Sequence, residues 1–229
     1  MSEHVAIVGG TGELGFGIAL RLGRRGRRVV IGSRSAEKAA DAVARVAEII
    51  GEDAPVEGAE NPEAVADARV VFVTVPYAGQ APTYKALKER WPEGAIVCDT
   101  TTPLATAVGA AATQVLRPWQ GSAAEQAASY LPGHVRFVSG FHTVSAEVLE
   151  DLDHDPDCDV LLCGRDGEAK AAVGELVEEM AMRWVDAGPL TMARVVEPLT
   201  AALIRVNKAY GIRNAGFRVT GREAWGRPG

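Results

Sequence analysis

A glycine-rich segment near the N-terminus places the strongest constraint on how this chain can fold. It reads GGTGELG, in which Gly10, Gly12 and Gly15 have the spacing G-x-G-x-x-G. A strand-forming run, His4–Gly9, precedes it, and a helical pattern, Leu14–Gly26, follows it. A strand, a glycine turn and a helix in this order are typical of dinucleotide-binding α/β folds, where the turn and the helix N-terminus hold a pyrophosphate. A tight turn without a ligand is the alternative.

Each glycine of this turn has an expected role. Gly10 permits the tight turn, Gly12 lets the backbone approach a pyrophosphate, and Gly15 lets the helix pack on the strand. The predicted phosphate-binding residues are therefore Gly10, Thr11, Gly12, Glu13, Leu14 and Gly15.

The rest of the chain alternates short β-branched runs with helical patterns. Several runs, such as VVFVTV, are almost continuously apolar, which is typical of parallel strands covered on both faces. The pattern predicts an α/β fold: a Rossmann-type doubly wound parallel sheet with a small, mainly helical C-terminal domain. We expect a dinucleotide-binding domain at residues 1–142 and the second domain at residues 143–229. The expected strands are His4–Gly9, Arg28–Gly32, Pro55–Ala59, Val70–Val75, Ala95–Asp99, Val135–Ser139, Asp159–Cys163 and Arg183–Asp186. The expected helices are Leu14–Gly26, Ala36–Ile50, Glu168–Met182 and Leu190–Tyr210, the last broken at Pro198.

Composition excludes several classes of protein. The net charge of −6 argues against a nucleic-acid binder, which usually carries a basic stripe. No apolar run approaches the ~20 residues of a membrane span, and the N-terminus does not resemble a secretion signal. The three cysteines lack CxxC spacing, which favours reduced thiols over a disulfide frame or a zinc site. We therefore expect a cytoplasmic protein that binds small molecules, with no metal.

The end of the second strand indicates which dinucleotide binds. An NAD site places an acidic residue there to hold the ribose 2′-hydroxyl, but this chain has Gly-Ser-Arg-Ser instead. The hydroxyl of Ser33, the guanidinium of Arg34 and the ammonium of Lys38 suit a 2′-phosphate. Basic residues are unfavourable at a helix N-terminus unless an anion is present, which weighs against an ordinary basic helix start. The predicted cofactor is NADP.

Three further segments follow predicted strands and face the expected cleft. Val75 and Pro76 end the fourth strand and are predicted to flank the nicotinamide ribose, although Pro76 can also simply end the strand. Asp99–Leu104 supplies hydroxyls that serve either a ligand or a turn. His142 is the only histidine placed beside the cleft. It either has a direct role, such as proton donation or orientation of a ring carbonyl, or has a structural role.

Most acid–base motifs of common NADP enzymes are absent. Among the tyrosines only Tyr84 has a lysine four residues later, Lys88, and no G-x-S-x-G, HExxH or Walker motif is present. Val144 and Ala146 can form a flat wall for a planar ring, or belong to the core. Direct hydride transfer between two stacked rings needs little protein chemistry beyond alignment, so it fits this site.

The ordered motifs resemble the NADPH-dependent coenzyme F420 reductases, also called F420H2:NADP oxidoreductases. The resemblance extends from about residue 4 to 221. The motifs that carry it are GGTGELG, GSR with Lys38, TVP, Pro103–Leu104, SAAE at Ser122–Glu125, HTVSA at His142–Ala146, DAGPL at Asp186–Leu190 and VEPLT at Val196–Thr200.

The resemblance implies a cytosolic homodimeric enzyme that moves a hydride between C4 of NADP(H) and C5 of the deazaflavin ring of F420. It implies NADP contacts at Thr11, Ser33, Arg34 and Lys38. It also implies a deazaflavin pocket at Val144, Ala146 and Gly216. The alternatives are an NADPH-dependent reductase of another acceptor, such as a flavin, a ferric chelate or an imine, and a non-enzymatic NADP sensor.

Overall fold

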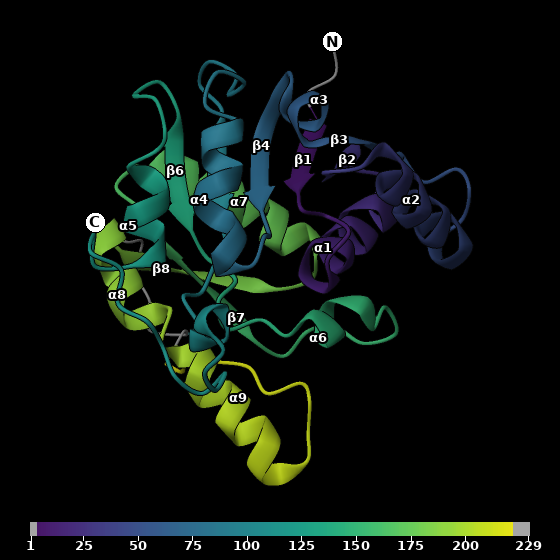
Figure 1. The fold of residues 1–229 in the computed structure, drawn as a ribbon. Coiled ribbons are helices and arrows are strands. Elements are labelled where there is room, and N and C mark those ends of the chain that lie inside the picture. Colours follow the sequence, from purple (N-terminus) through teal and green to yellow (C-terminus); the bar gives the residue numbers. More distant parts are fainter. Residues whose placement is uncertain (1–3, 222–229) are drawn as a thin grey trace.

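The computed structural model describes residues 4–221, which form an α/β fold around one eight-stranded sheet (Figure 1). The strand order is β3-β2-β1-β4-β5-β6-β7-β8, and every pairing is parallel except that of β6 with β7. The strands are β1 (His4–Val8), β2 (Val29–Ser33), β3 (Val56–Glu60), β4 (Ala68–Val73), β5 (Ile96–Asp99), β6 (Arg136–Ser139), β7 (Asp159–Cys163) and β8 (Arg183–Gly188). The predicted Rossmann-type fold is confirmed.

Helices cover both faces of the sheet. They are α1 (Glu13–Arg24), α2 (Ala36–Ile50), α3 (Asn61–Val65), α4 (Tyr77–Ala86), α5 (Ala123–Ala128), α6 (Ala146–Glu150), α7 (Gly167–Glu179), α8 (Ala193–Val196) and α9 (Leu199–Tyr210), with short 3₁₀ turns η1 (Ala105–Val108) and η2 (Leu190–Met192). No helix within residues 4–221 is both long and apolar enough to cross a membrane.

Alternation along the central strand explains the two layers. In β1, Val5 and Ile7 join a buried cluster with α1, α2, α6 and α7, whereas Ala6 and Val8 join one with α3, α4 and α5. Successive side chains of a strand point to opposite faces, so an entirely apolar strand needs a cover on both sides. The cores on both faces hold β1 rigidly below the glycine turn that follows it.

The C-terminal part of the chain first adds two strands to the sheet and then continues as helices beyond it. Strands β7 and β8 pair in parallel, but β7 meets β6 through a single antiparallel pair, Ser139 with Cys163. The predicted domain boundary at residue 142 lies between β6 and β7 within this continuous sheet, and it stays a prediction. Beyond β8, the helical segment is interrupted at Pro198, as predicted. Helix α9 begins directly after it and extends away from the sheet (Figure 1).

Candidate active site

A cleft of about 1630 Å³ runs along the carboxyl ends of the parallel strands. Ligands in doubly wound folds bind in this place, at the point where the strand order reverses, here between β1 and β4. Pockets for one drug-sized molecule measure roughly 300–1,000 Å³, so this cleft has room for two ligands side by side. We call its two ends the α2 end, lined by Ser33–Ser35, Lys38 and Glu60–Pro62, and the α9 end, lined by Thr100–Thr102, Leu104, Phe141–Ala146, Thr200, Leu203, Ile204, Asn207 and Ala215.

The glycine turn offers unpaired amides to the middle of the cleft. The backbone N–H groups of Thr11, Glu13 and Leu14 have no hydrogen-bond acceptor within residues 4–221, and all three residues line the cleft. A Cβ added to Gly12 would meet nothing closer than 3.5 Å, so the backbone there is open to a ligand. Open backbone and free amides at the start of α1 fit a pyrophosphate.

The other glycines of the turn act by packing. A Cβ on Gly10 would lie 2.8 Å from the carbonyl oxygen of Ile7, and one on Gly15 would lie 2.7 Å from Cα of Gly10. Neither residue lines the cleft. Gly15 thus brings α1 close to the turn, as its predicted role requires. The left-handed residue of this turn is Gly9, with φ of 74°, one residue before Gly10.

The α2 end presents two cations without counter-charges. Arg34 and Lys38 are exposed, line the cleft and have no ion-pair partner within the part of the chain that the structure describes. The Ser33 hydroxyl is buried and accepts from the Ser35 amide at 3.4 Å. Ser35 caps α2, as its position before the helix predicted, by accepting from the Lys38 amide at 3.4 Å. The two cations are thus held at the start of one helix, where an anion is favoured.

Two residues of this end escaped the sequence analysis. Asn61, at the start of α3, accepts from the Gly9 amide through its side-chain oxygen at 3.3 Å, and Glu60 beside it lines the cleft. The contact spans more than fifty residues of sequence, so no local pattern could reveal it. It ties the third strand to the glycine turn.

Val75 and Pro76 line the cleft between its two ends, as expected for residues after the fourth strand. The strand ends at Val73, and the Thr74 amide still bonds the Val8 carbonyl at 2.9 Å. Val75 therefore lies beyond the sheet, where its side chain comes within 2.7 Å of a Cβ added to Gly9. This close approach fixes the β4 loop against the glycine turn.

The wall of the α9 end begins with a strained residue. Phe141 has φ of 66°, is buried and packs edge-on against Phe72, with the ring centroids 5.5 Å apart. A bulky residue in the left-handed region costs roughly 1–2 kcal/mol, and such strain persists only where packing imposes it. The turn directs the next residues, His142, Val144 and Ala146, to the cleft.

His142 is part of a closed hydrogen-bond cycle. The Thr200 hydroxyl donates to the His142 carbonyl at 2.6 Å, so it accepts from Thr102 at 3.1 Å. The only hydroxyl hydrogen of Thr102 is thus donated to Thr200, so its oxygen accepts from Nδ1–H of His142 at 3.3 Å. Nε2 is left to accept from the Ser139 hydroxyl at 2.7 Å. Both ring nitrogens therefore have partners inside the protein.

The histidine in this cycle is neutral. Burial lowers its pKa to about 4, opposed by a hydrogen bond to the Thr100 carbonyl. Among the lining residues of the α9 end it is the only titratable side chain. This end therefore offers hydroxyl groups and apolar walls but no proton donor at neutral pH, and the predicted proton-donating role of His142 finds no support in its geometry.

Two buried carboxyl groups behind this end were not found from the sequence. Asp99, at the end of β5, accepts from the Tyr84 hydroxyl at 2.8 Å and from Gln80 at 3.2 Å. It also accepts from the Thr101 amide at 3.0 Å. Burial raises the pKa of Asp99 to about 6, and these hydrogen bonds oppose the rise. Asp99 thereby fixes the segment Thr100–Thr102 that lines the cleft.

Glu197, between α8 and α9, is the second buried carboxyl group. It accepts from the amides of Ala123 and Ala124 at the start of α5, both at 2.9 Å. Burial raises its pKa to about 8, and the two amide bonds oppose the rise. Glu197 thus anchors the segment that leads into α9.

Gly216 does not line the cleft. A Cβ there would lie 2.6 Å from Cβ of Cys158, whereas its neighbour Ala215 does line the α9 end. The three cysteines are buried and form no disulfide. Within residues 4–221, no group of three or more histidine, cysteine or acidic side chains could hold a metal ion.

Comparisons with known proteins agree on one family. Residues 4–103 match the family model described as NADP oxidoreductase coenzyme F420-dependent. The chain is 41% identical over 223 residues to the F420-dependent NADP reductase of Methanocaldococcus jannaschii, covering 96% of this chain and 99% of that protein. It is 39% identical over 223 residues to the protein of the same name from Methanothermobacter thermautotrophicus, covering 96% of both chains. A crystal structure from Arthrobacter sp. FB24, provisionally described as an F420-dependent NADP reductase, superimposes with a TM-score of 0.81 at 26% identity and covers 96% of this chain and 100% of that one.

Proposed function

Because this chain belongs to the family of F420-dependent NADP reductases, we propose that it transfers a hydride between NADP(H) and coenzyme F420 within the cleft. The observation that carries the proposal is a single cleft whose ends differ in chemistry. The α2 end has free cations, the middle has free amides, and the α9 end has apolar walls with no titratable group other than a neutral histidine.

The residues of the α2 end and the glycine turn fit NADP(H). Thr11, Glu13 and Leu14 offer amides to the pyrophosphate, while Arg34 and Lys38 offer charge to the 2′-phosphate. Val75 and Pro76 then border the nicotinamide ribose. The same arrangement discriminates against NAD(H). Because NAD(H) has no 2′-phosphate, Arg34 and Lys38 would remain without an anion when it is bound.

The α9 end fits a planar, uncharged ring. Thr102 and Thr200 have spent both hydroxyl hydrogens inside the protein, so each offers only lone pairs to the cleft. We propose that they accept hydrogen bonds from N–H or O–H groups of the deazaflavin ring, and that His142 positions them. Val144 and Ala146 form the apolar wall.

Hydride transfer requires the donor carbon of one ring to lie close to the acceptor carbon of the other. The protein's part is to align two rings and exclude water, because proximity alone can lower a barrier by roughly 7–11 kcal/mol. Hydride transfer leaves a negative charge on the reduced ring, and solvent supplies the proton that balances it. A histidine with a pKa of about 4 fits this mechanism, since no side chain of the α9 end has to supply that proton.

Anaerobic absorbance of the protein with NADPH and oxidised F420 tests the proposal. We expect the deazaflavin band to bleach. Replacing Arg34 by Ala should raise KM for NADPH about 10- to 100-fold, which corresponds to a charge-assisted hydrogen bond of roughly 1.5–3 kcal/mol. KM for F420 should change little.

Glu37→Ala is the matched control, because Glu37 lies three residues after Arg34, in the first turn of α2, but does not line the cleft. This variant should retain KM for NADPH. Bound NADPH without bleaching would contradict the proposal and would direct attention to another acceptor or to an NADP sensor.

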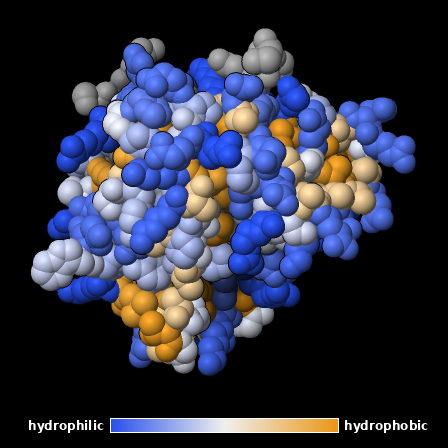
Figure 2. All heavy atoms as spheres, turned by 45° about the horizontal axis from the view of Figure 1, so that its top comes forward, coloured by the Kyte–Doolittle hydropathy of each residue, from blue (hydrophilic) through white to orange (hydrophobic). Residues whose placement is uncertain are grey.

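We also propose that the protein is a cytoplasmic homodimer. An exposed apolar surface on the C-terminal helices supports the dimer: Val195, Val206 and Tyr210 are 58%, 38% and 77% exposed. Figure 2 shows apolar side chains gathered at the lower end of the molecule, where α9 lies in Figure 1. Contiguous exposed apolar residues often mark an interface.

A further inference from the structure

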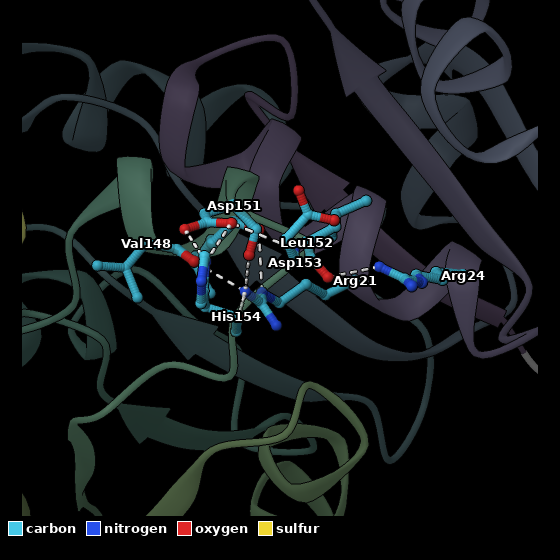
Figure 3. A network of polar contacts seen from close by, with 8 residues as sticks. Arg21, Arg24, Val148, Asp151, Leu152, Asp153 and His154 are labelled. Atoms are coloured by element: carbon cyan, nitrogen blue, oxygen red, sulfur yellow. Dashed lines mark hydrogen bonds and ion pairs between the residues drawn. The ribbon is translucent and has the colours of Figure 1, made fainter.

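A buried guanidinium joins the phosphate-binding helix to the wall of the α9 end. Arg21 lies in the second half of α1 and is only 6% exposed. Nε donates to the Leu149 carbonyl at 3.0 Å, and Nη2 donates to the carbonyls of Val148, Asp151 and His154 at 2.8, 2.5 and 2.9 Å. Figure 3 shows this network.

Every hydrogen-bond partner of Arg21 within residues 4–221 is a backbone carbonyl, the remaining one being Met180 at 3.4 Å from Nη1. No carboxylate in that range lies within ion-pair distance of it. Burying a cation is costly, and burial lowers the pKa of Arg21, while the charges of Asp155 and Asp151 oppose this shift from beyond ion-pair distance. The carbonyls compensate because the last ones of a helix have no partner within the helix and carry partial negative charge.

Apart from Met180, which caps the end of α7, these carbonyls belong to the C-terminal end of α6 and the loop that follows it. Helix α6 is only five residues long and has no side-chain cap at its start, so it needs an external partner. A second contact comes from Gly17, where an added Cβ would lie 2.6 Å from Cβ of Leu149 and 3.5 Å from the Ala146 carbonyl oxygen. Arg21 and Gly17 together hold α6 directly against α1.

The two joined helices carry different parts of the cleft, its middle and its α9 end. The N-terminal end of α1 presents Gly12, Glu13 and Leu14, whereas the N-terminal end of α6 presents Ser145 and Ala146. The position of α6 along α1 therefore sets how far the wall at Ala146 lies from the glycine turn. A shift of α6 would move this wall while leaving the turn in place.

We propose that Arg21 is a positioning residue for hydride transfer, which holds α6 so that the F420 ring lies at reacting distance from the nicotinamide. The inference rests on the proposed function. Arg21 touches neither substrate site, since it does not line the cleft, and its link to the wall of the α9 end runs through α6.

The test replaces Arg21 by Met, which keeps the length of the side chain and removes its charge and donors. We expect hydride transfer to slow at least about tenfold, because misplacement by about 1 Å can cost a hundredfold in rate. Kd of oxidised F420 for the NADP⁺-loaded protein and KM for F420 should rise as well, because the wall that contacts the ring has moved. Kd for NADP⁺ should stay within about twofold, since the glycine turn is untouched. The primary isotope effect with deuterated NADPH should change as ring alignment becomes limiting.

Arg24→Met is the matched control. Arg24 is also in the last turn of α1, and it also binds this loop, donating to the Leu152 carbonyl at 2.6 Å (Figure 3), but it is exposed and does not reach α6. Its F420 constants should equal those of the unaltered protein. A purely structural role for Arg21 would lower the thermal midpoint and the active fraction, and hence kcat, while Kd for F420 and the isotope effect stayed constant. That result would overturn the inference.

If Arg21→Met fails to fold, Gly17→Ala decides, because alanine favours the helix and yet forces α6 away. It should weaken F420 binding and leave NADP⁺ binding intact, and unchanged F420 binding would overturn the inference. Failure of the unaltered protein to reduce F420 would contradict the proposed function and remove this inference with it. If instead the unaltered protein reduces F420 and the variants bind F420 normally, the proposed function stands and only the inference about Arg21 is overturned.

Discussion

At the level of single residues, hydrogen-bond direction decides what His142 can do. Sequence position identified this histidine beside the cleft but left its role open. The structure surrounds it with Ser139, Thr102 and Thr200, whose hydroxyls occupy both ring nitrogens and the carbonyl. A local pattern can show that Ser139 lies three residues earlier, but Thr102 and Thr200 come from distant segments. Their contact with His142 depends on the complete fold.

A pH profile tests the neutral state of His142. Because burial lowers its pKa to about 4, its charge does not change between pH 5.5 and 8. We expect kcat/KM profiles of the unaltered protein and of His142→Asn to have the same shape over that range, with the variant lower throughout. An ionisation near pH 6.5 that disappears in the variant would show that His142 exchanges a proton during turnover.

At the level of elements, long periodic helices were predicted well and short ones were missed. Ala36–Ile50 agrees with the structure to the residue, because Ser35 caps it and its apolar residues recur at helical spacing. Helices α3, α5 and α6 have five or six residues, too few for a periodic signal. The predicted fourth strand, Val70–Val75, begins and ends two residues late, since Thr74 and Val75 continue its apolar pattern after they leave the sheet.

The junction of α5 with α8 and α9 depends on Glu197, and its stability should depend on pH. Burial raises the pKa of Glu197 from 4.5 to about 8. The folded state therefore holds this proton more tightly than the unfolded state, so stability is present at low pH and is lost as pH rises from about 4.5 to 8. Across that pH range, ionisation of Glu197 lowers the free energy of unfolding by on the order of a few kcal/mol.

Thermal midpoints of the unaltered protein and of Glu197→Gln, measured from pH 5 to 9, test this effect. Glutamine cannot ionise, so the midpoint of the variant relative to the unaltered protein should rise with pH. Asp99 is present in both proteins, so the effect of its titration on the thermal midpoint cancels when the two are compared. A constant difference between the two midpoints would show that Glu197 is already charged at pH 5.

At the level of the whole molecule, the fold and the NADP end of the cleft could be predicted, whereas the α9 end could be predicted only in part: His142, Val144 and Ala146 line it as expected, but their partners could not be identified. The glycine turn and the residues after β2 lie next to each element that positions them, so local order reveals them. The α9 end combines Thr102, Phe141 and Thr200 from three distant segments. The carboxyl groups of Asp99 and Glu197 are buried against elements far away in sequence, and only the folded structure pairs them.

The proposed dimer is also a property of the whole molecule. Val206→Asp places a charge on the exposed side of α9 and should weaken association at least about tenfold, as hot-spot substitutions of more than 1.4 kcal/mol do. Sedimentation equilibrium would measure it. Ile49→Asp is the control, because Ile49 is 52% exposed but lies on α2. Equal association of both variants and the unaltered protein would contradict an interface on α9.

The route of the chain through the cleft also has a consequence for synthesis. The glycine turn and the cations of α2 lie within the first forty residues, and the parallel strands that support them are complete by β5, whereas Thr200, Leu203 and Ala215 come last. A ribosome therefore releases the nucleotide-binding half before the far wall exists. On the proposed function, the F420 end is therefore the last part of the cleft to be completed.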